Sequence, residues 1–120
     1  IESTTCIRPE HPLFDAHEDG LPGWALIELM AQTIALHAGY LGRRNAQEPR
    51  IGYLLGTRRF ELRRTVCQVG ERIRIRAERE FHDPEGVSAY QCTAFENDDI
   101  IATAKLNVYQ QPQDNRGAVE

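Results

Sequence analysis

The sequence predicts an α+β domain in which an antiparallel sheet wraps around one long central helix. Two observations lead to this fold class. Residues 24–41 consist mostly of Ala, Leu, Ile, Met, Trp and Tyr, placed on nearly every face of a helix, which indicates a helix that is enclosed rather than one with a single apolar stripe. The chain after this helix changes to the two-residue period of strands, interrupted by turn residues. A sheet curled around the helix satisfies both patterns.

The elements follow one another in a simple order. A first strand ends at Pro9 and Pro12, and residues 10–23 form a loop with Gly and Pro at its end. After the helix comes one long strand with a bulge predicted at Gly56. The next strand alternates Ile and Ala with Arg, and the last two strands are joined by the turn residues 97–99. The predicted strands are residues 3–8, 50–64, 71–81, 87–96 and 100–109.

The predicted helix has the signals of a start and of an end. Pro22 precedes its first residue, where a missing N–H has no cost. Gly42 follows its last turn, and the next two residues are Arg, which complement the helix dipole. A single curled sheet cannot cover such a helix completely, so we expect a second copy to close the open side in a homodimer or a higher oligomer.

Size and composition limit the class of protein. The chain has 120 residues, of which 41% are hydrophobic and 27% charged, as expected for one globular domain. We predict a single domain over residues 1–110 and a polar tail over residues 111–120. No run of 18 apolar residues occurs, which argues against a membrane-spanning helix. Three widely spaced cysteines argue against a disulfide scaffold and a CxxC metal site, and favour a reducing cytoplasm.

The charge is distributed unevenly along the chain. The net charge is −4, but residues 43–76 contain ten Arg and three Glu, so this block is +7 and the remainder is −11. Such a block either receives an anionic partner or covers the outer face of a sheet. Nucleic acid is disfavoured as a partner, because the total charge is acidic and no binding motif is present.

The helix contains one acidic side chain, Glu28, among few polar groups. A buried carboxyl group must be paired, solvated in a cleft, or kept neutral by its surroundings. Gln32 lies one turn later on the same face and is placed to hydrogen-bond it. A carboxylic acid in such a place can act as a general acid, although Glu is also simply favoured near the start of a helix.

The loop before the helix adds two further candidates. His17 can act as a base near neutral pH, although a histidine in a loop is most often just exposed. The backbone N–H of Gly23 or Trp24 would point out of the helix start, where such donors stabilise anions and oxyanions. Together these groups place a base, an oxyanion site and an acid within one short stretch.

Four motifs resemble a known family. HPLFDAH at residues 11–17 resembles the PFFxGH stretch of hotdog-fold 3-hydroxyacyl-carrier-protein dehydratases of the FabZ and FabA type, and PGWALIELMAQ at residues 22–32 resembles their PGVLILEALAQ helix start. GYLLGTRRF at residues 52–60 resembles the strand that lines their acyl tunnel. With LNVY at residues 106–109, the chain looks most like the ApeP-type dehydratases of aryl-polyene biosynthesis. The N-terminal helix and first strand of the family are not found.

The resemblance implies a reaction and a set of residues. The reaction is dehydration of a 3-hydroxyacyl thioester, carried by acyl carrier protein, to a trans-2-enoyl thioester in fatty-acid or polyene-type biosynthesis. His17 would be the base and Glu28 the acid, with the two contributed by different subunits. Substrate contacts are expected from Gly23, Trp24, Gln32, Leu55 and Gly56. No metal or organic cofactor is expected, because the carrier supplies an activated thioester.

The basic block also predicts where the carrier binds. Carrier proteins are acidic, and we expect Arg58 or Arg59 to dock one near the entrance of the site.

Two alternatives remain open at this stage. A hotdog acyl-thioester hydrolase would use Glu28 to activate water and would not need His17. A catalytically silent hotdog subunit would complete an assembly with an active partner. The loop that carries His17 favours the second alternative, because it is three residues shorter than in the family.

Overall fold

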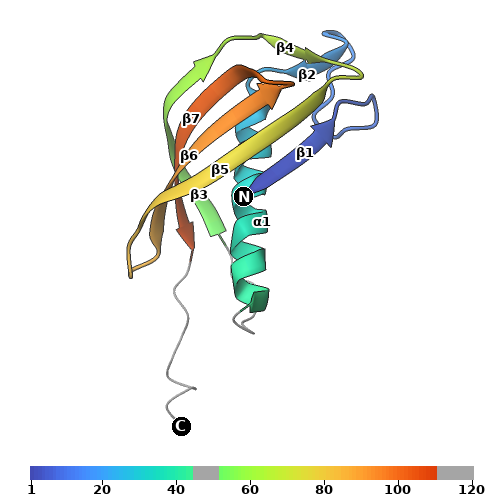
Figure 1. The fold of residues 1–120 in the computed structure, drawn as a ribbon. Coiled ribbons are helices and arrows are strands. Elements are labelled where there is room, and N and C mark those ends of the chain that lie inside the picture. Colours follow the sequence, from blue (N-terminus) through green and yellow to red (C-terminus); the bar gives the residue numbers. More distant parts are fainter. Residues whose placement is uncertain (45–51, 111–120) are drawn as a thin grey trace.

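The computed structural model describes residues 1–44 and 52–110. These contain one helix, five strands of a main sheet and two short strands, arranged as shown in Figure 1. The polar tail predicted for residues 111–120 and the first two residues of the strand predicted over 50–64 lie outside the described residues. The elements are β1 Glu2–Cys6, β2 Gly20–Pro22, α1 Ala25–Arg44, β3 Gly52–Leu62, β4 Val66–Gln68, β5 Arg72–His82, β6 Val87–Glu96 and β7 Asp99–Gln110.

The main sheet is antiparallel and curls around α1, which confirms the predicted fold class (Figure 1). Its strand order is β1-β5-β6-β7-β3, so the first strand of the chain pairs with β5 and the long β3 forms the opposite edge. Two register shifts interrupt β3, one between Leu54 and Gly56 and one between Arg58 and Glu61. The first confirms the bulge predicted at Gly56.

The core lies between α1 and the concave face of the sheet. Inward residues of β5, β6 and β7 alternate with outward ones, as the two-residue period predicts. The buried polar group of the helix, Thr33, donates to the Leu29 carbonyl over 2.8 Å and contacts Ser3 Oγ at 2.6 Å, so it costs little to bury. The largest fully buried apolar side chains are those of Ile7, Leu21, Leu26, Met30, Ile73, Ile75 and Leu106.

The composition of the helix predicts burial on nearly every face, and the single chain does not show this. One face packs on the sheet, but the other remains exposed within the single chain. Trp24, just before the helix, is 62% exposed, and Leu36 is 57% exposed. At the sheet edge, the β3 side chains of Leu54 and Leu55 are 45% and 56% exposed. Large exposed apolar side chains, when they gather into one patch, are typical of a surface that another chain covers.

A small second sheet was not predicted from the sequence. Strands β2 and β4 pair antiparallel, with Leu21 opposite Cys67, beside the start of the helix. Each is three residues long, too short to show an alternating pattern. The sequence predicts a loop over residues 10–23, which contain β2, and no element over residues 66–68. This small sheet determines how the chain enters α1.

Among the described residues, no helix is long and apolar enough to cross a membrane.

Candidate active site

The chain enters the helix through a tightly packed glycine. The Gly23 N–H donates to the Thr65 carbonyl over 2.7 Å. A Cβ atom at Gly23 would lie 2.5 Å from Leu62 Cδ2 and 2.6 Å from the Arg64 carbonyl oxygen, so the segment after β3 requires a glycine here. Because this donor is already used within the fold, the hydrogen bond argues against the Gly23 N–H as the group that holds a substrate oxygen.

The next donors of the helix start remain available. Within residues 1–44 and 52–110, no hydrogen bond is formed by the N–H groups of Trp24 and Ala25. They lie at the positive end of the helix dipole, where backbone donors attract negative charge. Trp24, which the sequence also names as a donor, and Ala25 therefore stay candidates for the predicted oxyanion site.

Glu28 lies on the exposed face of α1, one turn after Trp24. Gln32 follows one turn later and is also exposed. No hydrogen bond joins Glu28 to Gln32 or to any other described residue. Of the three states considered for this carboxyl group, the single chain therefore shows the solvated one. Trp24, Glu28 and Gln32 form one stripe of the helix, which we call the open helix face.

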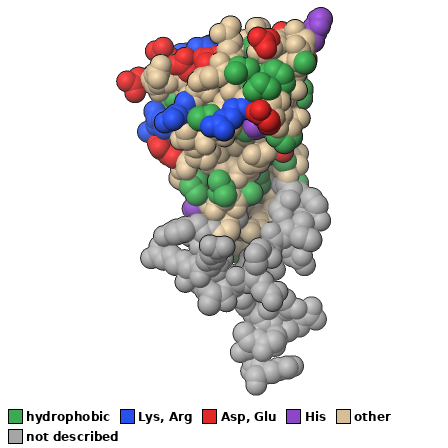
Figure 2. All heavy atoms as spheres, turned by 90° about the vertical axis from the view of Figure 1, so that its right-hand side faces the viewer, with side chains coloured by type: hydrophobic (Ala, Val, Ile, Leu, Met, Phe, Trp, Pro, Cys, Tyr) green, Lys and Arg blue, Asp and Glu red, His purple; other side chains and the backbone are tan. Residues whose placement is uncertain are grey.

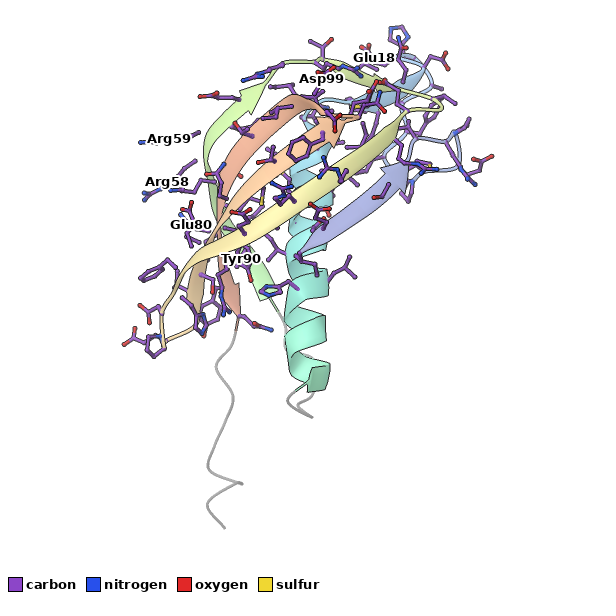
Figure 3. All side chains as sticks on the ribbon, in the orientation of Figure 1. Glu18, Arg58, Arg59, Glu80, Tyr90 and Asp99 are labelled. Carbon is purple, nitrogen blue, oxygen red and sulfur yellow. The ribbon has the colours of Figure 1, made fainter. Side chains whose placement is uncertain are left out.

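His17 lies at the tip of a tight turn formed by residues 15–20. Asp15 and Gly20 form an antiparallel bridge, in which each N–H donates to the other's carbonyl, over 2.9 Å and 3.3 Å. Inside the turn, the His17 N–H donates to Asp15 Oδ1 over 2.9 Å. The His17 side chain itself is exposed. Its neighbour Glu18 shows the place of this turn at one end of the molecule (Figure 3).

The structure does not bring His17 and Glu28 together within one chain. Among the described residues, neither side chain has a hydrogen bond or an ion pair. Each lies exposed on its own part of the surface, as two halves of a site would before a second subunit is added. The prediction that they come from different subunits agrees with this geometry and stays a prediction.

Strand β3 presents the remaining predicted residues. Leu55 is the extra residue of the first bulge, and Gly56 has open space where a Cβ would be. Arg59 has a positive φ of 53° and lies inside the second bulge. Arg58 and Arg59 both project from β3 away from α1 (Figure 3), although consecutive strand residues normally point to opposite faces. Both are exposed, and neither has an ion pair among the described residues.

Other arginines of the basic block are already paired. Positive and negative side chains lie next to one another on one face of the molecule (Figure 2). Glu2 forms ion pairs with Arg74 and Arg76, over 3.2 and 3.1 Å, and Arg74 also lies 4.2 Å above the ring of Phe95. These arginines cover the outer face of the sheet, which is the second of the two roles considered for the basic block of residues 43–76.

A network near the helix start was missed by sequence reasoning. Arg64 forms ion pairs with Glu71 and, over 3.2 Å, with Glu96. Glu71 also accepts the Gln68 N–H over 2.6 Å. The network thus ties β4, β5 and the β6–β7 hairpin to the segment that contacts Gly23. No sequence pattern identifies it, because its members are far apart in the chain.

The other titratable groups of the core are structural. His37 Nδ1 lies 3.0 Å from the Tyr90 hydroxyl, and burial, with the nearby Arg79 charge, lowers the pKa of His37. Burial raises the pKa of the Cys67 thiol to about 11 and that of Cys92 to about 12, so neither is a thiolate nucleophile near neutral pH. Over the described ranges, no three His, Cys, Asp or Glu side chains gather into a metal site.

Comparison with known proteins gives a family and a fold. The sequence matches the ApeP-like family, described as ApeP dehydratase, over residues 1–119. Among proteins with curated descriptions, none matches. A similar solved structure is the dehydratase heterocomplex ApeI:P from Xenorhabdus doucetiae, with a TM-score of 0.84 and 22% identity, covering 98% of this chain and 78% of that one.

Two thioesterases share the architecture at lower identity. A probable thioesterase from Bartonella henselae has a TM-score of 0.71 at 9% identity, covering 95% of this chain and 98% of that chain. A hypothetical thioesterase from Streptococcus pneumoniae TIGR4, solved with coenzyme A, has a TM-score of 0.70 at 14% identity, covering 93% and 81%. These likenesses confirm the hotdog fold.

Proposed function

Since the chain belongs to the family of ApeP-like dehydratases, we propose that it removes water from a 3-hydroxyacyl thioester to give a trans-2-enoyl thioester. The observation that carries the proposal is the open helix face. It places one acid, Glu28, one turn from the free N–H groups of the helix start, among exposed apolar side chains that suit an acyl chain.

The reaction needs three groups. A base removes the proton from C2, and the electron pair of that C–H bond forms the C2=C3 double bond. An acid protonates the C3 hydroxyl, which leaves as water with the electrons of its C–O bond. Donors to the thioester oxygen stabilise the negative charge that develops on it. Proton exchange with solvent then restores the acid and the base.

Each group has a candidate in the chain. His17 is the base, because it offers an exposed imidazole on the turn that precedes the helix start. Glu28 is the acid. The N–H groups of Trp24 and Ala25 hold the thioester oxygen, in place of Gly23. The acid and the base each contribute roughly 10²–10⁴-fold to the rate.

The complete site requires a second subunit. One chain leaves both Glu28 and His17 in water, whereas efficient acid–base chemistry at a thioester needs a site from which water is excluded. We propose a homodimer or a higher oligomer in which the open helix face and the β3 edge are covered. The His17 turn of one subunit then reaches the Glu28 of the other.

The acyl group is proposed to arrive on an acidic carrier protein. Arg58 and Arg59 support this, because the bulge directs both to one side and leaves them without acidic partners among the described residues. Leu55 and Gly56 precede them on the same strand and would line the path of the acyl chain. The proposed setting is the cytoplasm, in fatty-acid or polyene-type biosynthesis.

One experiment tests the reaction and its residues. Hydration of a 2-enoyl thioester is measured for the wild type, Glu28→Gln and His17→Ala, with the acyl group on a carrier protein and on a short free thiol. Each variant should lose most of its activity on both substrates. Reversing Arg58 and Arg59 to Glu should weaken only the carrier-borne reaction, in a salt-dependent manner. Wild-type rates in both Glu28→Gln and His17→Ala would refute the assignment.

Two alternatives are supported by particular observations. The thioesterase neighbours favour hydrolysis of the thioester, and release of free thiol from a saturated acyl thioester would identify that reaction. The heterocomplex among the similar structures and the exposed His17 favour a silent subunit. A stable hetero-oligomer whose activity survives His17→Ala in this chain would identify that role.

A further inference from the structure

The turn that carries His17 is held at its base by backbone bonds, but at its tip by one side chain. The bridge between Asp15 and Gly20 closes a loop of four residues, Ala16–Asp19. Gly20 is fixed against β4, since a Cβ there would collide with the Cys67 carbonyl. Asp19 adopts a left-handed φ of 55° to complete the turn. Among the described residues, the Asp15 side chain is the one that hydrogen-bonds His17 itself.

We propose that Asp15 is a positioning residue for the catalytic base. Its Oδ1 atom accepts the His17 N–H over 2.9 Å and fixes the backbone from which the imidazole projects. This inference rests on the proposed role of His17. An Asp side chain that accepts an N–H two residues later is a recurrent way to fix a turn, and here the fixed residue is the one that must reach another subunit.

Among the described residues, few contacts other than this hydrogen bond fix the position of His17. The His17 imidazole contacts no other described polar group, so its direction depends on its backbone and on its own rotamer. Without Oδ1, the tip of the loop can rotate while the bridge at its base stays closed. A catalytic group displaced by about 1 Å can lose on the order of 10²-fold in rate.

The chain contains a matched control for this bond. Asp83, in the turn between β5 and β6, accepts the Glu85 N–H at Oδ1 over 2.6 Å. Its turn is likewise closed by backbone bonds, including Asp83 N–H to the Val87 carbonyl over 2.7 Å. Removing either carboxylate therefore removes the same type of bond from an exposed turn. The Asp83 turn, however, carries no residue of the proposed site.

The test compares four variants, assayed as assembled full-length protein. Asp15→Ala should lower kcat by roughly 10- to 100-fold with little change in KM. Asp15→Asn, which keeps the Oδ1 acceptor, should retain nearly all of kcat. Asp83→Ala should match Asp15→Ala in any loss of thermal stability but keep wild-type kcat. His17→Ala defines the rate without the base.

The outcomes separate this inference from the proposed function. If His17→Ala is inactive while Asp15→Ala keeps the wild-type kcat, the positioning role is wrong and the role of His17 stands. If His17→Ala is fully active, both fail. If Asp15→Asn falls as far as Asp15→Ala, the carboxylate acts by its charge and the inference is overturned. The pH–kcat profile gives a further check, because positioning lowers the plateau and leaves the position of the acidic limb, on which the base becomes protonated, unchanged.

Discussion

The most informative prediction concerns the origin of the two halves of the site. In one chain, His17 and Glu28 are both exposed and have no contact with each other. If the site is formed between subunits, a chain that lacks His17 and a chain that lacks Glu28 can complement each other. We therefore propose to mix His17→Ala with Glu28→Gln, each of which is expected to be nearly inactive alone.

The expected activity of the mixture follows from counting sites. With equal amounts and free exchange, about half of the dimers contain one subunit of each kind. Each such dimer has one site with both groups intact and one site with neither. About a quarter of all sites are then functional, so the mixture should recover roughly 25% of the wild-type rate per subunit. This far exceeds the residual rate of either variant, if each loses about 10²-fold or more.

The assay uses two affinity tags, so that the mixed dimer can be purified and its rate of hydration measured directly. The purified mixed dimer should have about half of the wild-type rate, because one of its two sites is intact. As a control, the double variant carrying both changes in one chain is mixed with the wild type. That mixed dimer leaves each site with one missing group and should be nearly inactive. If the purified dimer of the double variant and the wild type is active, while the purified dimer of His17→Ala and Glu28→Gln is inactive, both groups act within one chain.

Two further predictions concern folding. Gly23→Ala should lower the free energy of unfolding by about 1–3 kcal/mol, because its Cβ would press on Leu62 and on the Arg64 carbonyl. Gly39→Ala is the control and should not lower the free energy of unfolding, because a Cβ there meets open space. Urea unfolding measures both variants. The pKa of His37 is lowered in the folded state from 6.5, first by burial, so the unfolded chain takes up the proton first and stability should fall as the pH drops below about 6.5. In His37→Gln this part of the loss should vanish, and an unchanged pH dependence of the unfolding midpoint would contradict it.

Local pattern predicted most of the fold. The strand β6 was predicted with its observed bounds, and α1 and the other long strands within a few residues, because their periods of 3.6 and 2 are sustained over many residues. Strands β2 and β4 have no such period. Each is held by pairing with a segment more than forty residues away, and Pro22 within β2 argued for a loop.

The candidate site was predicted less completely, and the reasons differ between residues. The helix spacing alone places Trp24, Glu28 and Gln32 on one face. The loss of Gly23 as a donor could not be foreseen, because its partner is the carbonyl of Thr65 in a distant segment. Asp15 did leave a signal, since Asp two residues before the fixed N–H is typical of such turns. From the sequence alone, Asp15 appears only as a member of the HPLFDAH motif at residues 11–17.

The apolar composition of the helix combines two separate requirements. Leu26 and Met30 are fully buried against the chain's own sheet, while Trp24 and Leu36 are largely exposed. A sequence does not distinguish an apolar side chain that packs within its chain from one that packs against another chain, because both avoid water for the same reason. The distinction matters for Glu28, which lies among the second group. A carboxyl group on that face leaves water only when a second subunit covers it, so the step that buries the apolar stripe is also the step that would enclose the acid, and assembly and catalysis become one requirement on the same residues.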